Sequence, residues 1–164
     1  MKMLGTLALA AVLAGTLAAC AGGPAPQAPE AQAPAAPSLP TVDTAGAEGL
    51  LSSDEALQPL GFAATGSTRT AGSVVGYNST AFAVPVAAGQ TLTVEFVPSN
   101  TNLYMNIHDT RDQTGAAVFR GEFDGSRAVL TPSAPTTYLI RPFQPRATAR
   151  RGERGEFTLT VSRS

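Results

Sequence analysis

The sequence predicts an all-β protein whose folded part is a small antiparallel β-sandwich or jelly roll of seven or eight strands, placed after a disordered Pro/Ala-rich linker. Apolar and polar residues alternate with a period of two through the C-terminal two thirds of the chain. Turn-forming residues separate these runs at short intervals, and no helical pattern of ten residues lies between them. These features favour strands joined by short turns and argue against βαβ units.

Residues 1–19 have the composition of a secretory signal peptide. Lys2 precedes an apolar run from Met3 to Ala19 that is too short and too alanine-rich for a good permanent membrane span. The segment Leu17-Ala18-Ala19-Cys20 resembles a bacterial lipobox, in which a peptidase cleaves before the cysteine and its thiol receives a diacylglycerol. This resemblance implies acyl chains such as palmitate on Cys20. The alternative is that Cys20 is an ordinary apolar residue of the signal.

Cys20 is the only cysteine of the chain, so an intramolecular disulfide is impossible. Two or three acyl chains anchor a protein stably, so we expect a protein that is attached to a membrane without spanning it. Residue 21 is Ala, whereas Asp at this position is the usual signal for inner-membrane retention in lipoproteins. The resemblance therefore implies an outer-membrane lipoprotein that faces the periplasm.

Residues 20–48 are predicted to be the lipidated cysteine and a disordered linker, because proline and alanine dominate and large apolar residues are almost absent. The linker either holds the following domain away from the membrane or simply avoids folding. Residues 49–62 form a short helical or irregular lead-in, with Ser52 as N-cap, Glu55 completing a capping box and Pro59 ending the helix. The β-sandwich domain is predicted over 63–164. Its candidate strands are 71–77, 79–86, 90–97, 102–108, 116–122, 126–131, 136–143 and 156–162.

The sequence carries no recognisable catalytic constellation, so we predict a protein that is not an enzyme and needs no cofactor. His108 is the only histidine, and its neighbour Asp109 would point to the opposite face of a strand. No serine lies in a Gly-x-Ser-x-Gly elbow. The histidine and cysteine partners that a zinc site needs are absent, and the acidic residues near Asp109 do not have the spacing of a calcium-binding loop. We predict no metal site.

Charge is unevenly distributed along the chain. Without the signal peptide, ten arginines stand against twelve acidic residues, so no field suited to nucleic acid surrounds the protein. Five arginines nevertheless lie between Arg141 and Arg154. Arg146, Arg150 and Arg151 belong to a loop between two predicted strands, and we expect them to project into water. Arginine offers a planar fork of donors that fits carboxylates, so this loop is either a site for an acidic partner or a solvated loop without function.

Several short motifs resemble the periplasmic inhibitors of g-type lysozyme. They run in order from Gly76-Tyr77 to the closing strand at Phe157–Val161, and the intervening ones are Ala88–Leu92, Tyr104–Ile107, Tyr138–Arg141 and Ala149–Glu153. The resemblance covers about Thr70 to Val161. It implies a β-sandwich that blocks a lysozyme by inserting surface loops into the glycan-cleaving cleft, whose chemistry depends on carboxylic acids.

By matching position, the resemblance implies that Tyr77, Arg146, Arg150 and Arg151 contact the partner. The leading hypothesis is therefore a monomeric lipoprotein whose domain binds lysozyme or another envelope protein and does not bind nucleic acid. The alternative is an envelope scaffold, a module that binds peptidoglycan or an outer-membrane partner without inhibiting an enzyme.

Overall fold

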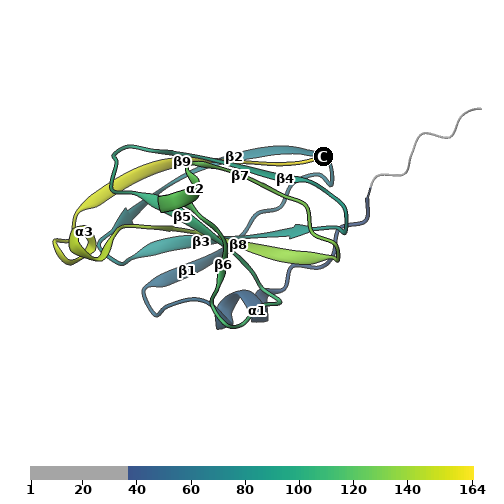
Figure 1. The fold of residues 1–164 in the computed structure, drawn as a ribbon, viewed down its shortest axis with the longest axis horizontal. Coiled ribbons are helices and arrows are strands. Elements are labelled where there is room, and N and C mark those ends of the chain that lie inside the picture. The colour runs from purple at the N-terminus through teal and green to yellow at the C-terminus, as the bar shows by residue number, and fades with distance from the viewer. Residues whose placement is uncertain (1–36) are drawn as a thin grey trace, which may run out of the picture. The chain divides into compact units, whose positions relative to one another are not determined.

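The structure, a computed structural model, describes residues 37–164 and has two β-sheets packed face to face (Figure 1). The predicted signal peptide, the lipid attachment at Cys20 and most of the predicted linker lie outside the described residues. The all-β prediction is confirmed. The elements in chain order are α1 (Thr44–Gly49), β1 (Glu55–Pro59), β2 (Gly66–Val75), β3 (Ser79–Val86), β4 (Leu92–Pro98), β5 (Tyr104–Asp109), β6 (Ala117–Arg120), α2 (Gly121–Asp124), β7 (Arg127–Leu130), β8 (Thr136–Phe143), α3 (Arg146–Arg150) and β9 (Arg154–Arg163).

One sheet has five strands in the order β1-β3-β8-β5-β6, and the other has four in the order β2-β9-β4-β7. Every pairing is antiparallel except that of β1 with β3. All eight strands expected from the period-two pattern are present, with ends that differ by a few residues, and β1 is an addition. None of the helices in residues 37–164 is long and apolar enough to cross a membrane.

The core between the sheets is centred on Phe157 of β9. Its ring lies edge-on to Phe82 of the five-stranded sheet, with centroids 6.1 Å apart, and tilted against Phe96 at 5.2 Å. Aromatic pairs in these geometries stabilise a core beyond their buried area. Gly72 on β2 leaves the room for this ring, because a Cβ there would lie 2.6 Å from it.

A second apolar cluster lies on the outer face of the five-stranded sheet. Ala47 and Leu50, from α1 and the residue after it, pack against Ala81, Ala83 and Leu139 of β3 and β8. The backbone N–H of Asp43 also donates to Thr137 Oγ1 at the start of β8, at 2.9 Å. The first half of β8 is therefore buried on both faces.

The lead-in over 49–62, expected to be helical or irregular, contains a strand instead of a helix. The expected contact between Ser52 and Glu55 does form, since Ser52 donates from its N–H and its hydroxyl to Glu55 Oε2 at 2.9 Å. It closes a turn, however, and Glu55 begins strand β1, because the edge of β3 offers unpaired backbone groups and Leu57 can join the apolar cluster under α1. The predicted linker is also too long at its C-terminal end, since residues 44–48 belong to α1.

Arg163 at the end of β9 ties the segment between β1 and β2 to the sandwich. The side chain is only 2% exposed. It donates to the carbonyl oxygens of Pro85 and Phe62, both at 2.8 Å, and its guanidinium lies 3.7 Å from the centroid of the Phe62 ring. A buried cation held this way contributes to stability through both hydrogen bonds and the cation–π contact.

We expect Arg163→Met to lower the free energy of unfolding by about 2 kcal/mol, because the buried carbonyl of Pro85 and the partly buried carbonyl of Phe62 would lose their donor. Urea unfolding followed by circular dichroism measures this loss. Arg69→Met is the matched control, since Arg69 is exposed on β2, and it should change stability by less than about 0.5 kcal/mol. Equal losses in both variants would contradict the role given to Arg163.

Candidate binding site at the α3 end of the sandwich

The turn between β2 and β3 lies directly against the α3–β9 connection. The N–H of Gly76 donates to the carbonyl oxygen of Glu153 at 3.0 Å. Gly76 has a φ of 61°, and a Cβ at this position would lie 3.2 Å from the carbonyl oxygen of Ala149, so the close approach favours glycine. Tyr77 follows in the turn and is 49% exposed. The structure thus places the turn that contains Tyr77 beside the arginine-rich segment, which begins 69 residues later in the chain at Arg146.

The arginine-rich segment, expected to be a loop, contains the short helix α3. Arg146 and Arg150 are its first and last residues. Arg146, Arg150 and Arg151 are all exposed, as predicted. Arg151 donates from Nε to Glu153 Oε1 at 2.5 Å, whereas no carboxylate of residues 37–164 forms an ion pair with Arg146 or Arg150. These two arginines therefore offer their full set of donors to a partner.

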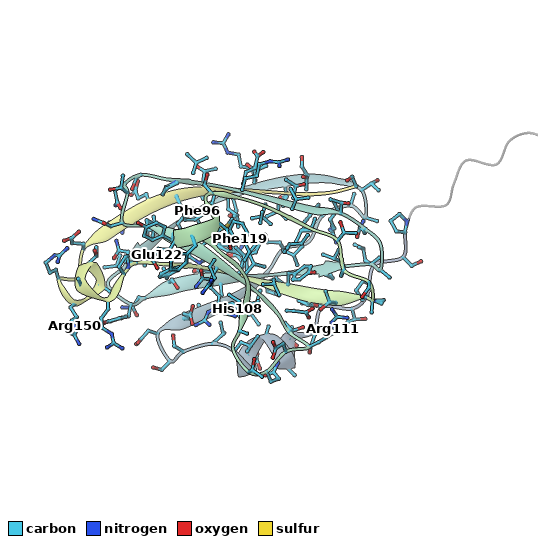
Figure 2. All side chains as sticks on the ribbon, in the orientation of Figure 1. Phe96, His108, Arg111, Phe119, Glu122 and Arg150 are labelled. Carbon is cyan, nitrogen blue, oxygen red and sulfur yellow. The ribbon has the colours of Figure 1, made fainter. Side chains whose placement is uncertain are left out.

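A groove of about 560 Å³ runs from this end along the outer face of the five-stranded sheet, on the part that α1 leaves open. Tyr77 and Arg146 line the groove, and Arg150 and Arg151 lie outside it. Figure 2 shows Arg150 at the α3 end of the sandwich and His108 farther along, on the five-stranded sheet. The four predicted contact residues therefore share one end of the domain, but only two of them face the groove.

The base of the groove contains a charged pair that the sequence reasoning missed. Arg141 donates from Nε to Glu55 Oε1 at 2.9 Å and from Nη2 to Glu55 Oε2 at 2.5 Å. Arg141 is half-buried, because its side chain pairs with Glu55 of β1, two strands away in the same sheet. Glu55 and Leu57 are spaced two apart, as on one face of a strand, and this spacing could have predicted β1. The segment was instead interpreted as a capping box at the start of a helix.

Burial alone would raise the pKa of Glu55, but the hydrogen bonds from Arg141 and Ser52 outweigh it, and the pKa is lowered from the usual 4.5. The charged form of Glu55 is therefore favoured in the folded protein. Its contribution to stability is present above about pH 4.5 and is lost as the pH falls through the lower folded-state pKa.

His108 lies on the outer face of β5 and is 4% exposed. Burial, and secondly the nearby charge of Arg141, lower its pKa from 6.5, so the ring is neutral at pH 7. The backbone at Ala116 and Gly115 lies near the ring and acts in the opposite direction, to raise the pKa of His108. Neither ring nitrogen forms a hydrogen bond of normal geometry. Asp109 is engaged elsewhere, by Arg111 and Thr136.

Within the described part of the chain, no group of three or more His, Cys, Asp or Glu side chains is placed to hold a metal ion. The site presents an exposed phenol and, among residues 37–164, two guanidinium groups without an ion-pair partner, beside a groove lined by both polar and apolar side chains.

Comparison with solved structures identifies the family. Aeromonas hydrophila PliG, a periplasmic lysozyme inhibitor of g-type lysozyme, is 32% identical to this chain over 68% of its length and 98% of the inhibitor, with a TM-score of 0.60. The chain belongs to the PliG family. Salmonella Typhimurium PliG and a mutant of the Escherichia coli inhibitor are 19% and 18% identical, cover 66% and 68% of this chain and 97% and 100% of their own, and both have TM-scores of 0.49. No protein-family model and no curated protein matches the chain.

In this PliG-family chain we expect Glu55→Gln to destabilise the fold at pH 7 by about 2 kcal/mol, because Arg141 would lose a charged acceptor. The difference from wild type should shrink as the pH falls below about 4.5, since a protonated Glu55 resembles glutamine. Urea unfolding at a series of pH values measures it.

Glu95→Gln is the matched control, because Glu95 forms an exposed pair with Arg127 at 3.3 Å. That substitution should cost less than about 0.5 kcal/mol at any pH. A pH-independent loss in Glu55→Gln would contradict the assignment of the charged carboxylate to the base of the groove.

Proposed function

We propose that this protein is a lipid-anchored inhibitor of a g-type lysozyme, located in the bacterial cell envelope and acting by binding without catalysis. Membership of the PliG family supports the partner class, because the relative that shows the family is a periplasmic inhibitor of that enzyme. The observation that carries the proposal in this chain is the juxtaposition of Tyr77 with Arg146 and Arg150 at one end of the sandwich.

The chemistry of this end suits a lysozyme cleft. Glycoside hydrolases generally act through paired carboxylic acids in a cleft. Arg146 and Arg150 have no acidic partner among residues 37–164 and can offer charge-assisted hydrogen bonds to such acids. Tyr77 supplies a rigid ring with a polar tip, the type of side chain that dominates protein interfaces. Arg151 contributes less in this proposal, because its Nε already donates to Glu153 Oε1.

The proposed anchor fits the position of this surface. Cys20 would carry the lipid, and the Pro/Ala-rich segment after it would act as the spacer. The described chain enters the domain near the start of β8, where Asp43 bonds to Thr137, whereas α3 follows the end of β8 (Figure 1). A domain tethered from its N-terminal side would present Tyr77 and α3 at its far end. We place the protein on the periplasmic face of the outer membrane.

We expect the purified chain, residues 21–164, to inhibit a g-type lysozyme in a cell-lysis assay. Arg146→Ala and Arg150→Ala should each raise the inhibition constant about tenfold or more, and combining them with Tyr77→Ala should abolish inhibition. Arg151→Ala should have a smaller effect. Arg69→Ala, an exposed arginine on the four-stranded sheet, is the control and should change inhibition less than about twofold.

A chain that inhibits no g-type lysozyme, or a triple variant that inhibits as well as wild type, would overturn the proposal. Sedimentation with purified peptidoglycan sacculi in the absence of inhibition would favour the envelope scaffold instead.

The anchor is tested independently of inhibition. In cells that express the full chain, we expect Cys20→Ala to move the protein from the outer-membrane fraction to a soluble or uncleaved form. Mass spectrometry of the wild-type N-terminal peptide should find Cys20 as its first residue, carrying a diacylglycerol. An uncleaved leader with an unmodified Cys20 would contradict the anchor.

A further inference from the structure

A second pair of an aromatic ring and an arginine lies beside the groove, on β6 and α2. The side chain of Phe123 is 71% exposed, the largest fraction among the large apolar side chains of residues 37–164. The guanidinium carbon of Arg120 lies 4.8 Å from the centroid of this ring, which is within the range of a cation–π contact. The pair has the same composition as Tyr77 and Arg146, which line the groove at the α3 end.

The strand register places this second pair on the face that carries the groove. Phe119 of β6 points into the core, so its neighbour Arg120 points to the outer face of the five-stranded sheet. The cross-strand partner of Arg120 is Asn106 of β5, which lines the groove. Glu122, next to Phe123 in the chain, lines the groove as well. The pair therefore lies at the β6 side of the groove.

The chain holds Phe123 on a short, closely packed turn. Gly121, the first residue of α2, packs so closely against the backbone of Met105 that a Cβ at this position would clash with it. The carboxylate of Asp124 accepts the N–H of Arg120 at 2.7 Å and closes the turn. A residue held on such a turn loses little freedom when a partner binds, even though most of its side chain is in water.

Arg120 is available to an acidic partner. Its side chain is exposed, and no carboxylate of residues 37–164 forms an ion pair with it. Arg146 and Arg150 have the same property on the opposite side of the groove. Both sides of the groove therefore present guanidinium groups that can form charge-assisted hydrogen bonds to carboxylates.

One protein partner is large enough to cover both pairs. Strand β3, which follows Tyr77, and strand β6, which carries Arg120, are three strand spacings apart in the sheet, or about 14 Å. A standard interface covers about 800 Å² on each protein, which is about 30 Å across for a round patch. The two pairs and the groove between them therefore fit within a single interface.

We propose that Arg120 and Phe123 form a second contact cluster for the g-type lysozyme, on the β6 side of the groove. This inference rests on the proposed function and extends its interface beyond the α3 end. A single exposed apolar residue is common on protein surfaces. An aromatic residue and an exposed arginine on each side of one groove, however, have the composition of interface hot spots. The acids of a lysozyme cleft are suitable partners for these arginines.

We expect Phe123→Ala to raise the inhibition constant of the chain of residues 21–164 about tenfold or more, and Arg120→Ala about threefold or more, in the cell-lysis assay. The matched controls, Val97→Ala and Arg69→Ala, remove an exposed apolar and an exposed basic side chain from the four-stranded sheet and should change it less than about twofold. An unchanged urea midpoint verifies that each variant is folded. Inhibition by Phe123→Ala equal to that of the wild type would overturn the proposal.

A thiol footprint measures whether the lysozyme covers this side of the groove. Residues 21–164 include no cysteine, so Glu122→Cys introduces a single thiol next to Phe123 and leaves both residues of the cluster intact. We expect saturating lysozyme to slow maleimide labelling of this thiol severalfold. Glu95→Cys, at an exposed position on β4, is the control and should react at the same rate with and without lysozyme. Labelling of Glu122→Cys that lysozyme does not slow would also overturn the proposal.

The outcomes separate this cluster from the proposed function. A chain that inhibits no g-type lysozyme would remove both proposals. Inhibition that is lost in the triple variant of Tyr77, Arg146 and Arg150 but unchanged in Phe123→Ala would remove only the second cluster. Inhibition that is lost in Phe123→Ala but retained in the triple variant would support the second cluster and remove the contacts proposed for the α3 end.

Discussion

The packing of Phe157 against Phe82 and Phe96 is the constraint on which the rest of the domain depends, because Phe157 and Phe96 of the four-stranded sheet meet Phe82 of the five-stranded sheet in the shared core. Strand β8 belongs to one sheet and β9 to the other, and α3 is the connection between them. Fixing the sheets therefore fixes both ends of the segment that carries Arg146 and Arg150. Binding residues held on such a short connection lose little freedom when a partner arrives.

One part of the outer face of the five-stranded sheet packs against α1, and another part lines the groove. At one end, α1 packs on Leu139 and its neighbours and completes the fold. At the other end, the same face is open and forms the groove beside Tyr77, with the Glu55–Arg141 pair at its base. Because Glu55 lies on β1, the N-terminal lead-in is part of the site as well as of the core. In the proposed inhibitor, the lead-in would connect the tether to the binding surface.

The period-two pattern was sufficient to predict the strands, because alternation such as Leu92, Val94 and Phe96 has no helical counterpart. A local contact was misleading at residues 52–59, where tertiary pairing decided the secondary structure. The Ser52–Glu55 contact forms, but pairing with the edge of β3 makes the segment a strand. The groove was not predictable, since Glu55 and Arg141 are 86 residues apart and only sheet order places them together. Tyr77 emerged from the family resemblance, and the arginines emerged first from their clustering between two predicted strands. The sequence did not show that Arg151 donates to Glu153.

The most direct test of the account is to map the surface that a g-type lysozyme covers, using amide chemical shifts of the isotope-labelled chain. The account predicts perturbations that cluster at residues 76–78 and 145–152, with the outer face of the four-stranded sheet unchanged. Perturbations confined to that sheet, or none at stoichiometric lysozyme, would contradict the claim that the domain acts through its α3 end.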